Sequence, residues 1–369
     1  MKTWNDIAGA SNAEILRWAE SQSWARAMAA CAQDAQWHAE GDVWTHTRMV
    51  FAAVEKLEAW SLLDRQAQIQ LLLTALFHDT GKPTTTTIDA ATGRTHSAKH
   101  ALISTQIVRG VLRELNCDFA TREQIAALVR FHGRPQHLLE KASPEREVIS
   151  LSWIVNNRLL YLFALADTRG RHKDEMDRPE ENLRLWKLVA EEHGCLDRPY
   201  AFGNNHARFL FYRDQLSNLR FAPHEKFRCT VTLMSGLPGT GKDTWLARQR
   251  PTLPVVALDA IRDELDVEPT DDQGEVIQAA REKCRANLRA SRSFAFNATN
   301  IMRQTRQRWI DLFTDYGARI EIVYLEPPIA KVLAQNKRRP TPVPESVILR
   351  LLEKLEPPTI TECHELVFD

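Results

Sequence analysis

The sequence predicts a multidomain protein, in which an all-α domain over residues 1–225 precedes an α/β domain with a parallel sheet over residues 226–369. The length of 369 residues is sufficient for two separate hydrophobic cores. In the first part, apolar residues recur at helical spacing. In the second part, short apolar segments alternate with helical ones, which is typical of parallel sheets built from strand–helix–strand units.

The overall charge and the cysteines limit the classes of function. Lys plus Arg and Asp plus Glu both number 48, so only local basic patches could attract nucleic acid. The six cysteines are scattered without a Cys-x-x-Cys pair, which argues against a zinc ribbon or a disulfide framework and fits a reducing cytosol. The N-terminus lacks an apolar signal core and no segment is apolar enough to span a membrane, so we expect a cytoplasmic protein without a membrane partner.

Helical periodicity places most of the first domain in helices, the first of which begins at a capping asparagine. Threonine-rich residues 84–88 and residues 94–95 flank an expected hairpin around residues 91–93. We expect a loop at residues 195–203 and the domain boundary at residues 222–225. The expected helices span residues 12–20, 43–60, 67–78, 98–115, 121–131, 147–166, 178–193 and 204–221.

Residues 230–244 contain the pattern of a phosphate-binding loop directly after an expected strand. Its glycines let backbone N–H groups converge on phosphate oxygens, and Lys242 would reach the β- and γ-phosphates of a nucleotide. The alternative, a glycine-rich surface turn, leaves the lysine and the apolar strand unexplained. The residues expected to bind the nucleotide are Gly236, Gly239, Thr240, Gly241, Lys242, Asp243 and Thr244. The strands are expected at residues 227–234, 255–258, 294–296 and 320–325.

Asp243 departs from the phosphate-loop pattern, which has Ser or Thr at this position. A hydroxyl group there contacts Mg²⁺, whereas a carboxylate is a charged ligand for the same ion. Without a metal between them, the carboxylate would repel the phosphates. We therefore expect Asp243 to bind Mg²⁺ directly or through a neighbour, and Thr244 to support the metal or to cap the following helix.

Asp259 and Arg262 form a second polar motif, placed where an expected strand ends. Ligands of open α/β sheets bind at this edge, and Arg262 would point to the same side one helical turn later. An aspartate there can accept the proton of an attacking hydroxyl group, as catalytic bases in kinases do. Alternatively, Asp259 is a helix cap with an ion-pair partner. Residues 297–300 (Asn-Ala-Thr-Asn) form another polar strand end.

Arginines gather in two later stretches, residues 281–308 and residues 337–339. Arginines above a transferred phosphoryl group can stabilise its charge from a mobile lid. They could equally belong to a solvated helix face or follow a nucleic-acid backbone. For Arg281 to Arg289, a solvated helix face is the preferred interpretation.

Histidines and aspartates at expected helix ends form a candidate metal site in the first domain. Imidazole nitrogens and carboxylate oxygens bind divalent first-row metals, and adjacent His-Asp residues can share one ion. A single histidine in a helix is more often an ordinary core or surface residue. Lys82 and Arg169 are placed to hold a phosphate, or else are solvated helix ends. The candidate ligands are His46, His78, Asp79, His100, His132 and Asp167.

Residues 76–83 (Leu-Phe-His-Asp-Thr-Gly-Lys-Pro) resemble the signature of the HD phosphohydrolase superfamily. The resemblance covers roughly residues 40–175. It implies that His46 and Asp167 are the outer ligands, that His100 and His132 hold a second ion, and that phosphomonoesters or phosphodiesters are hydrolysed with divalent metal such as Mn²⁺, Ni²⁺ or Co²⁺. His96 competes with His100 for its assignment, and His137 competes with His132. The histidines without a counterpart are His38, His172, His193 and His206.

Most of residues 228–357 resemble the polynucleotide 5′-hydroxyl kinase family, because the phosphate loop, Asp259 and Arg262, the 297–300 edge and the later arginines occur in its order. The resemblance implies that Asp259 is the general base and that Arg262 contacts phosphate. Arg339 matches the lid arginine of the family, with Arg338 as a competitor. The sequence departs from the family at residues 335–336, which read Gln-Asn where Arg-Asn is frequent.

The order of the two regions is similar to that of bacterial bifunctional RNA end-healing enzymes. This resemblance implies a kinase that uses ATP or another NTP with Mg²⁺ on 5′-OH ends of RNA or DNA. It also implies a hydrolase for 2′,3′-cyclic phosphate and 2′- or 3′-phosphate ends, and an RNA ligase as a possible partner. Neither RNA-versus-DNA preference nor oligomeric state follows from the sequence.

Three other readings remain open. An HD nucleotide phosphohydrolase could be fused to a small-molecule kinase. The phosphate-loop domain could instead be a nucleotide sensor that regulates the HD domain, although a sensor has no use for a base such as Asp259. The HD domain could also be an RNA-binding remnant as in tRNA nucleotidyltransferases, which the filled ligand positions disfavour.

Overall fold

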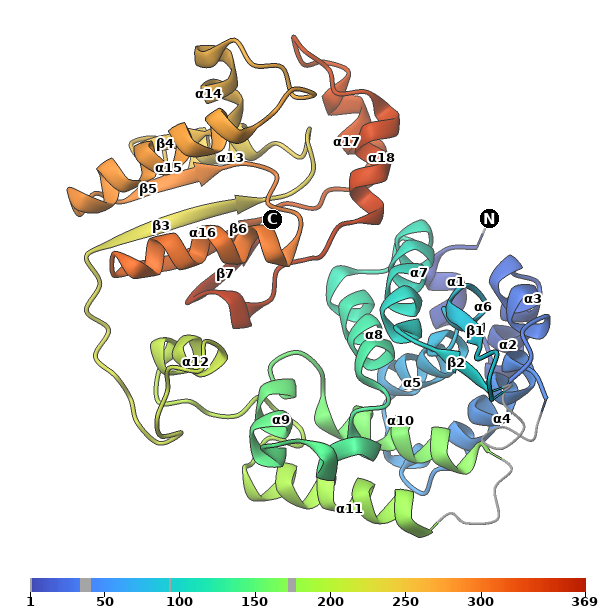
Figure 1. Cartoon of the computed structure of the whole chain (residues 1–369). Helices are drawn as coiled ribbons and strands as arrows, with labels where there is room; N and C mark the ends of the chain where they lie inside the picture. Colours follow the sequence, from blue (N-terminus) through green and yellow to red (C-terminus); the bar gives the residue numbers. More distant parts are fainter. Residues whose placement is uncertain (1, 34–40, 93, 172–176) are drawn as a thin grey trace. The chain divides into compact units, whose positions relative to one another are not determined.

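The computed structural model describes residues 2–33, 41–92, 94–171 and 177–369 of the chain. The chain forms two compact units, Met1–Ala201 and Phe202–Asp369 (Figure 1). His38, His172 and the glycine of the expected hairpin, Gly93, lie outside the described residues. In the part of the chain that the structure describes, no helix has the length and apolar character needed to cross a membrane.

The first unit is helical, as predicted, apart from one two-stranded hairpin. Its strands β1 (Thr86–Ile88) and β2 (Thr95–Ser97) pair antiparallel, and Thr86 lies opposite Ser97. Its helices are α1 (Trp4–Ala8), α2 (Asn12–Glu20), α3 (Ser23–Ala29), α4 (Val43–Glu55), α5 (Arg65–Phe77), α6 (Lys82–Thr85), α7 (His100–Glu114), α8 (Phe119–Phe131), α9 (Pro144–Leu151), α10 (Asn157–Arg169) and α11 (Asp177–Glu192). The 3₁₀ turns η1 (Trp60–Leu62) and η2 (Pro135–Glu140) complete it.

Helix caps explain where several of these helices begin. The side chains of Asp42, Asp64 and Asp118 accept hydrogen bonds from backbone N–H groups in the first turns of α4, α5 and α8. Asn156 does the same for α10 by accepting from the N–H of Leu159 at 3.0 Å. The prediction of a single helix at residues 147–166 is therefore wrong, because this cap starts a new helix after α9 has ended.

The second unit is an α/β domain with a five-stranded sheet in the order β4-β5-β3-β6-β7, and all its strand pairs are parallel, as predicted. The strands are β3 (Cys229–Ser235), β4 (Val255–Ala257), β5 (Phe294–Asn297), β6 (Ala318–Tyr324) and β7 (Glu365–Phe368). The helices are α12 (Asn205–Tyr212), α13 (Lys242–Gln249), α14 (Leu258–Leu265), α15 (Gly274–Arg289), α16 (Arg303–Asp315), α17 (Ile329–Asn336) and α18 (Glu345–Glu353). The edge strand β7 and the short 3₁₀ turn η3 (Ile360–Glu362) were not expected from the sequence.

The alternation of side chains along β3 gives the sheet two buried faces. Val231 and Leu233 point to the face where α15 and α16 pack, and Trp309 of α16 belongs to the same cluster (Figure 1). Met234 points the other way and packs with Trp245 of α13. The central strand is therefore covered by helices on both sides, which holds its carboxyl end and the following loop in place.

Helix α12 belongs to the second unit and packs on the residues just before β7. Arg208 donates hydrogen bonds to the backbone carbonyls of Cys363 and His364 at 3.1 and 2.9 Å, and the ring of Phe209 stacks on His364. The division between the units therefore precedes the predicted boundary at residues 225 and 226. The helix is shorter than expected, because Asp214 has a left-handed backbone with φ of 57°.

Candidate metal centre and phosphate site

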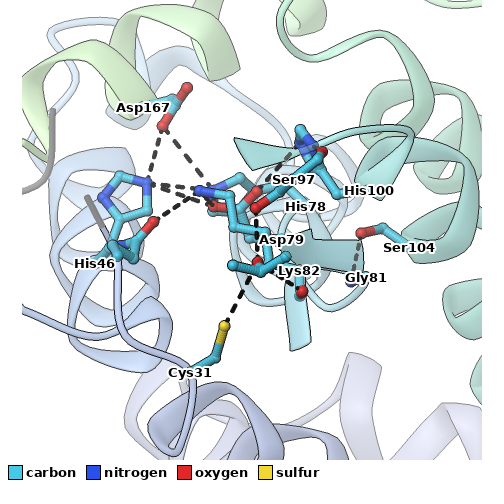
Figure 2. Close-up of polar contacts among 12 residues, drawn as sticks. Cys31, His46, His78, Asp79, Gly81, Lys82, Ser97, His100, Ser104 and Asp167 are labelled. Atoms are coloured by element: carbon cyan, nitrogen blue, oxygen red, sulfur yellow. Dashed lines mark hydrogen bonds and ion pairs between the residues drawn. The ribbon is translucent and has the colours of Figure 1, made fainter. Parts of the chain in front are cut away.

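The side chains expected to bind metal converge in the first unit in two sets. Figure 2 shows how His46, Asp79 and Asp167 lie around His78, with His100 beside Asp79. The first set comes from α4, from the end of α5 and from α10. The second set comes from the end of α5, from the start of α7 and from the end of α8. Within each set, the potential ligand atoms lie within 4.8 Å of one another. The two sets are His46, His78 and Asp167, and Asp79, His100 and His132.

The adjacent residues His78 and Asp79 connect the two sets. The Nε2 of His78 lies 3.4 Å from the Nε2 of His46 and 3.2 Å from Oδ2 of Asp79. The other carboxylate oxygen of Asp79 lies 3.4 Å from the Nε2 of His100. Asp167 closes the first set, with its Oδ1 3.2 Å from the Nε2 of His46. Two neighbouring ions could thus share the Asp79 carboxylate.

Three of the histidines are oriented by the same local hydrogen bond. The Nδ1 atoms of His78, His100 and His132 lie 2.9, 2.9 and 2.8 Å from the backbone carbonyl of the residue three positions earlier. A carbonyl only accepts, so Nδ1 carries the proton and Nε2 keeps its lone pair for a ligand. Burial, together with the neighbouring His78 and His100, lowers the pKa of His132 to about 3, which keeps this ring neutral. The donor set therefore fits a divalent metal.

The two buried carboxyl groups are ionised. Burial by itself would raise the pKa of Asp79, but His78 and Lys82 outweigh burial and hold this pKa well below its usual range. Burial likewise opposes ionisation of Asp167, and Arg171 with His46 lowers its pKa well below the usual range. Both groups are thus available as anionic ligands.

Two glycines allow the helices of the centre to approach closely. A β-carbon at Gly81 would lie 2.3 Å from the carbonyl oxygen of His100, where α6 meets the start of α7. A β-carbon at Gly170 would lie 2.8 Å from the Cα of Val50, where the end of α10 meets α4. The first contact positions His100 beside Asp79, and the second positions α10 beside the helix that carries His46.

The cationic residues near the metal centre differ in their partners. The Nζ of Lys82 lies 2.8 Å from Oδ2 of Asp79, within the centre. Arg169 instead donates to Glu180 at 2.9 and 3.3 Å. Arg171 donates to Oδ2 of Asp167 at 2.6 Å, and Gln136 donates to the same oxygen at 3.3 Å. Arg171 was not expected at this centre from the sequence, although its place one helical turn after Asp167 was a usable signal.

The structure places the two pairs of competing histidines differently. His100 and His132 lie in the metal centre. His96 is exposed on β2, and His137 is paired with Glu140 at 2.7 Å.

The phosphate loop of the second unit follows β3. Its glycines at positions 236, 239 and 241 all have positive φ. The ammonium group of Lys242 donates to the carbonyl oxygens of Gly236 and Leu237 at 3.0 and 2.8 Å, which holds it over the loop. Burial lowers the pKa of Lys242 to about 8, and nearby Asp243 and Asp259 oppose this shift. The hydroxyl of Thr240 donates to the same Leu237 carbonyl at 3.0 Å.

Asp259 lies with two of the predicted arginines near the phosphate loop. Arg262 donates to its Oδ1, and the Nη2 of Arg339 lies 3.5 Å from its Oδ2. Arg338 is exposed. The strand expected at residues 255–258 ends one residue earlier, and α14 begins at Leu258. Asp259 therefore lies in the first turn of α14, two residues after the carboxyl end of β4.

Asp243 accepts a hydrogen bond of 2.6 Å from Nδ2 of Asn297, the last residue of β5. Thr244 is exposed in the first turn of α13. The N-cap of α13 is Gly241, so the expectation that Thr244 caps this helix is wrong. Its possible support of a metal stays a prediction.

Arg306 has a structural contact within the second unit. It is fully buried, donates to Glu362 at 2.7 and 3.0 Å, and also donates to the carbonyl of Asn300 at 3.0 Å. This excludes it from the arginines that could clamp a phosphate. Asn300 in turn donates to the carbonyl of Met234 at 2.8 Å, and the N–H of Gly236 donates to the carbonyl of Thr299 at 2.9 Å. The 297–300 edge therefore supports the start of the phosphate loop.

Two protein-family models match the chain: an HD domain at residues 43–155 and an AAA domain at residues 231–358. The HD match lies in the helical unit, and the AAA match lies in the α/β unit that carries the phosphate loop. Asp167 lies beyond the matched part of the HD domain.

A curated relative is the CC-adding tRNA nucleotidyltransferase of Thermus thermophilus, 32% identical over 151 residues, which cover 38% of this chain and 32% of the relative. The chain thus spans about a third of that relative's length. Similar solved structures include a candidate kinase from Chloroflexus aurantiacus, with 18% identity, a TM-score of 0.30 and coverage of 39% of this chain and 85% of the other. Another is a gluconokinase from Sinorhizobium meliloti, with 17% identity, a TM-score of 0.29 and coverage of 39% and 82%.

Proposed function

We propose that the protein heals the ends of broken polynucleotides. The P-loop domain transfers the γ-phosphate of ATP or another NTP to a 5′-OH end of RNA or DNA. The HD domain hydrolyses 2′,3′-cyclic phosphates and 2′- or 3′-phosphates. The observation that supports this most directly is the presence of both phosphate sites on one chain, since their products are the 5′-phosphate and 3′-OH ends that a ligase joins. An RNA ligase is the partner that this chemistry calls for.

The arrangement around Asp259 suits the kinase step. Its side chain is 73% exposed, so a bulky polynucleotide end can reach it. In the proposed step the 5′-oxygen bonds to the γ-phosphorus, the bond to the β–γ bridging oxygen breaks, and the hydroxyl proton passes to Asp259. Arg262 orients this carboxylate, while Lys242 and Arg339 stabilise charge on the transferred group. Bound Mg²⁺ would neutralise the remaining phosphate charge.

The metal centre suits the hydrolytic step. The histidines and aspartates of the two sets would hold one or two divalent ions, such as Mn²⁺, Ni²⁺ or Co²⁺. Such ions lower the pKa of a bound water and neutralise non-bridging oxygens of the phosphate. Lys82 and Arg171 bring positive charge to the same centre. Arg169 remains a proposed phosphate contact, although its guanidinium group is held by Glu180.

The curated relative supports a polynucleotide substrate over a small molecule, because its name describes an enzyme that acts on tRNA. The ionised Asp79 and Asp167 and the oriented histidines also favour a working metal centre over an RNA-binding remnant. A nucleotide sensor would need no base, whereas Asp259 is held by two arginines beside Lys242.

The test uses oligonucleotides of RNA and of DNA with labelled 5′-OH or 2′,3′-cyclic phosphate ends. The protein is incubated with each nucleoside triphosphate and each divalent metal separately. We expect phosphate transfer to the 5′ ends and loss of the cyclic phosphate. Transfer to a nucleoside or a sugar, with none to either polynucleotide, would exclude the proposed kinase substrate.

A further inference from the structure

Two residues beside the phosphate loop have exchanged their usual chemical types. In P-loop proteins, Mg²⁺ is held by the Ser or Thr that follows the loop lysine and by an aspartate on a neighbouring strand. Here Asp243 follows the lysine, and Asn297 ends β5, which pairs directly with the loop-bearing strand β3. The carboxylate and the neutral polar group are both present, in opposite places.

The contact between the two side chains is direct. The Nδ2 of Asn297 donates to Oδ1 of Asp243 at 2.6 Å. An ionised carboxylate only accepts hydrogen bonds, so the nitrogen of the amide must face it. Asn297 is 7% exposed, and its Oδ1 has no hydrogen-bond partner among the described residues. A buried acceptor such as this Oδ1 needs a donor. We expect that a ligand bound at this site brings the donor, for example as a bound water.

We infer that Asp243 and Asn297 together form a charge-exchanged site for the Mg²⁺ of the bound nucleotide. Asp243 is exposed in the first turn of α13 and supplies the anionic oxygen, while the buried Asn297 positions this carboxylate. Asn297 is thus a positioning residue. The inference rests on the kinase half of the proposed function and names how that site holds its metal.

The charges explain why the exchange would need both residues. One carboxylate remains at the site, as in the usual arrangement. The net charge of the two side chains beside the nucleotide phosphates is therefore the same. An aspartate at both positions would place two carboxylates at hydrogen-bonding distance, where like charges repel. A neutral side chain at both positions would leave the metal without an anionic oxygen, the type of ligand that Mg²⁺ binds in proteins.

The test measures, by electron paramagnetic resonance, the Mn²⁺ binding that depends on added ADP, as the difference between full-length protein with and without ADP. Ions held by the metal centre of the first unit cancel in this difference, and no polynucleotide is present. We expect Asp243→Ser to weaken Mn²⁺ binding by about 10- to 100-fold. The double variant Asp243→Ser/Asn297→Asp restores the usual arrangement and should bind Mn²⁺ nearly as tightly as the original protein. An unchanged affinity in the single variant, or no recovery in the double variant, would overturn the inference.

Controls separate this result from misfolding and from failure of the proposed function. ADP binding in a chelator should be similar in all variants that fold. If the double variant does not fold, Asp243→Asn, of equal size, must still weaken Mn²⁺ binding, and an unchanged affinity there also overturns the inference. Asp315→Ser removes an exposed carboxylate at the opposite edge of the sheet and should have no effect. Because no polynucleotide is present, absent kinase activity on 5′ ends would leave this measurement intact.

Discussion

The Asp167 carboxylate uses its two oxygens for different contacts. Its Oδ1 faces His46 and His78, at 3.2 and 3.9 Å, whereas its Oδ2 accepts hydrogen bonds from Arg171 and Gln136. The second oxygen thus fixes the direction of the first. Partners of this kind affect metal affinity because they hold a ligand in its binding orientation.

At this residue scale we expect Arg171→Gln to weaken binding of Mn²⁺ to the first unit by about 10- to 100-fold, since Asp167 loses its strongest hydrogen bond. Isothermal titration of the full chain measures this affinity. Arg169→Gln is the matched control, because Arg169 pairs with Glu180 and not with a candidate ligand. Equal losses of Mn²⁺ affinity in the Arg171→Gln and Arg169→Gln variants would contradict the positioning role of Arg171.

At the scale of elements, the metal centre depends on how closely α10 approaches α4. Gly170 follows α10, and a side chain there would meet the backbone of Val50 on α4. His46 lies on α4 and Asp167 on α10, so the distance between these helices sets the separation of two ligands in one set.

We therefore expect Gly170→Ala to lower the free energy of unfolding by about 1–3 kcal/mol, because the added methyl overpacks the helix contact. Mn²⁺ affinity should fall in the same variant. Both are measured by chemical denaturation and metal titration.

Gly110→Ala provides the control within α7. A β-carbon at Gly110 meets no atom within 4 Å, so this substitution should be neutral or stabilise the helix by up to about 1 kcal/mol. A similar loss of metal affinity in both glycine variants would show that the approach of α10 to α4 is not the cause.

At the scale of the whole molecule, each proposed reaction has its residues within one compact unit. The candidate ligands of the histidine–aspartate centre lie in the first unit, and Lys242, Asp259, Arg262 and Arg339 lie in the second. The two reactions are therefore expected to be separable by single substitutions.

We expect Asp259→Ala to abolish phosphorylation of 5′-OH ends and to leave hydrolysis of cyclic phosphate ends intact, because only the kinase base is lost. His78→Ala should have the reverse effect, because it removes a ligand of the metal centre. Both activities are measured on the same preparation, with circular dichroism as the check on folding. Loss of both activities in either folded variant would contradict independent sites.

Local sequence patterns were sufficient to predict the fold class, the residue types of the candidate centres and the form of the phosphate loop. These features are local: helix periodicity, capping residues and the glycine spacing each act within a few neighbouring residues. The helices expected at residues 67–78 and 121–131, for example, end at or next to His78 and His132, which are the C-caps of α5 and α8 in the structure. Short-range signals therefore locate these two candidate ligands at helix ends.

Which of these side chains contact one another depends on the packing of whole helices and strands, which local patterns do not specify. The fold brings His100 and not His96 to Asp79, and it pairs Asn297 with Asp243. These contacts join residues on different secondary-structure elements. In the case of His100 and His96, they also decide which of two nearby histidines reaches Asp79. Their distances depend on how closely elements pack, which side-chain size at contacts such as Gly81 and Gly170 controls. Such packing involves partners far apart in the chain, and periodicity within one segment carries no information about it.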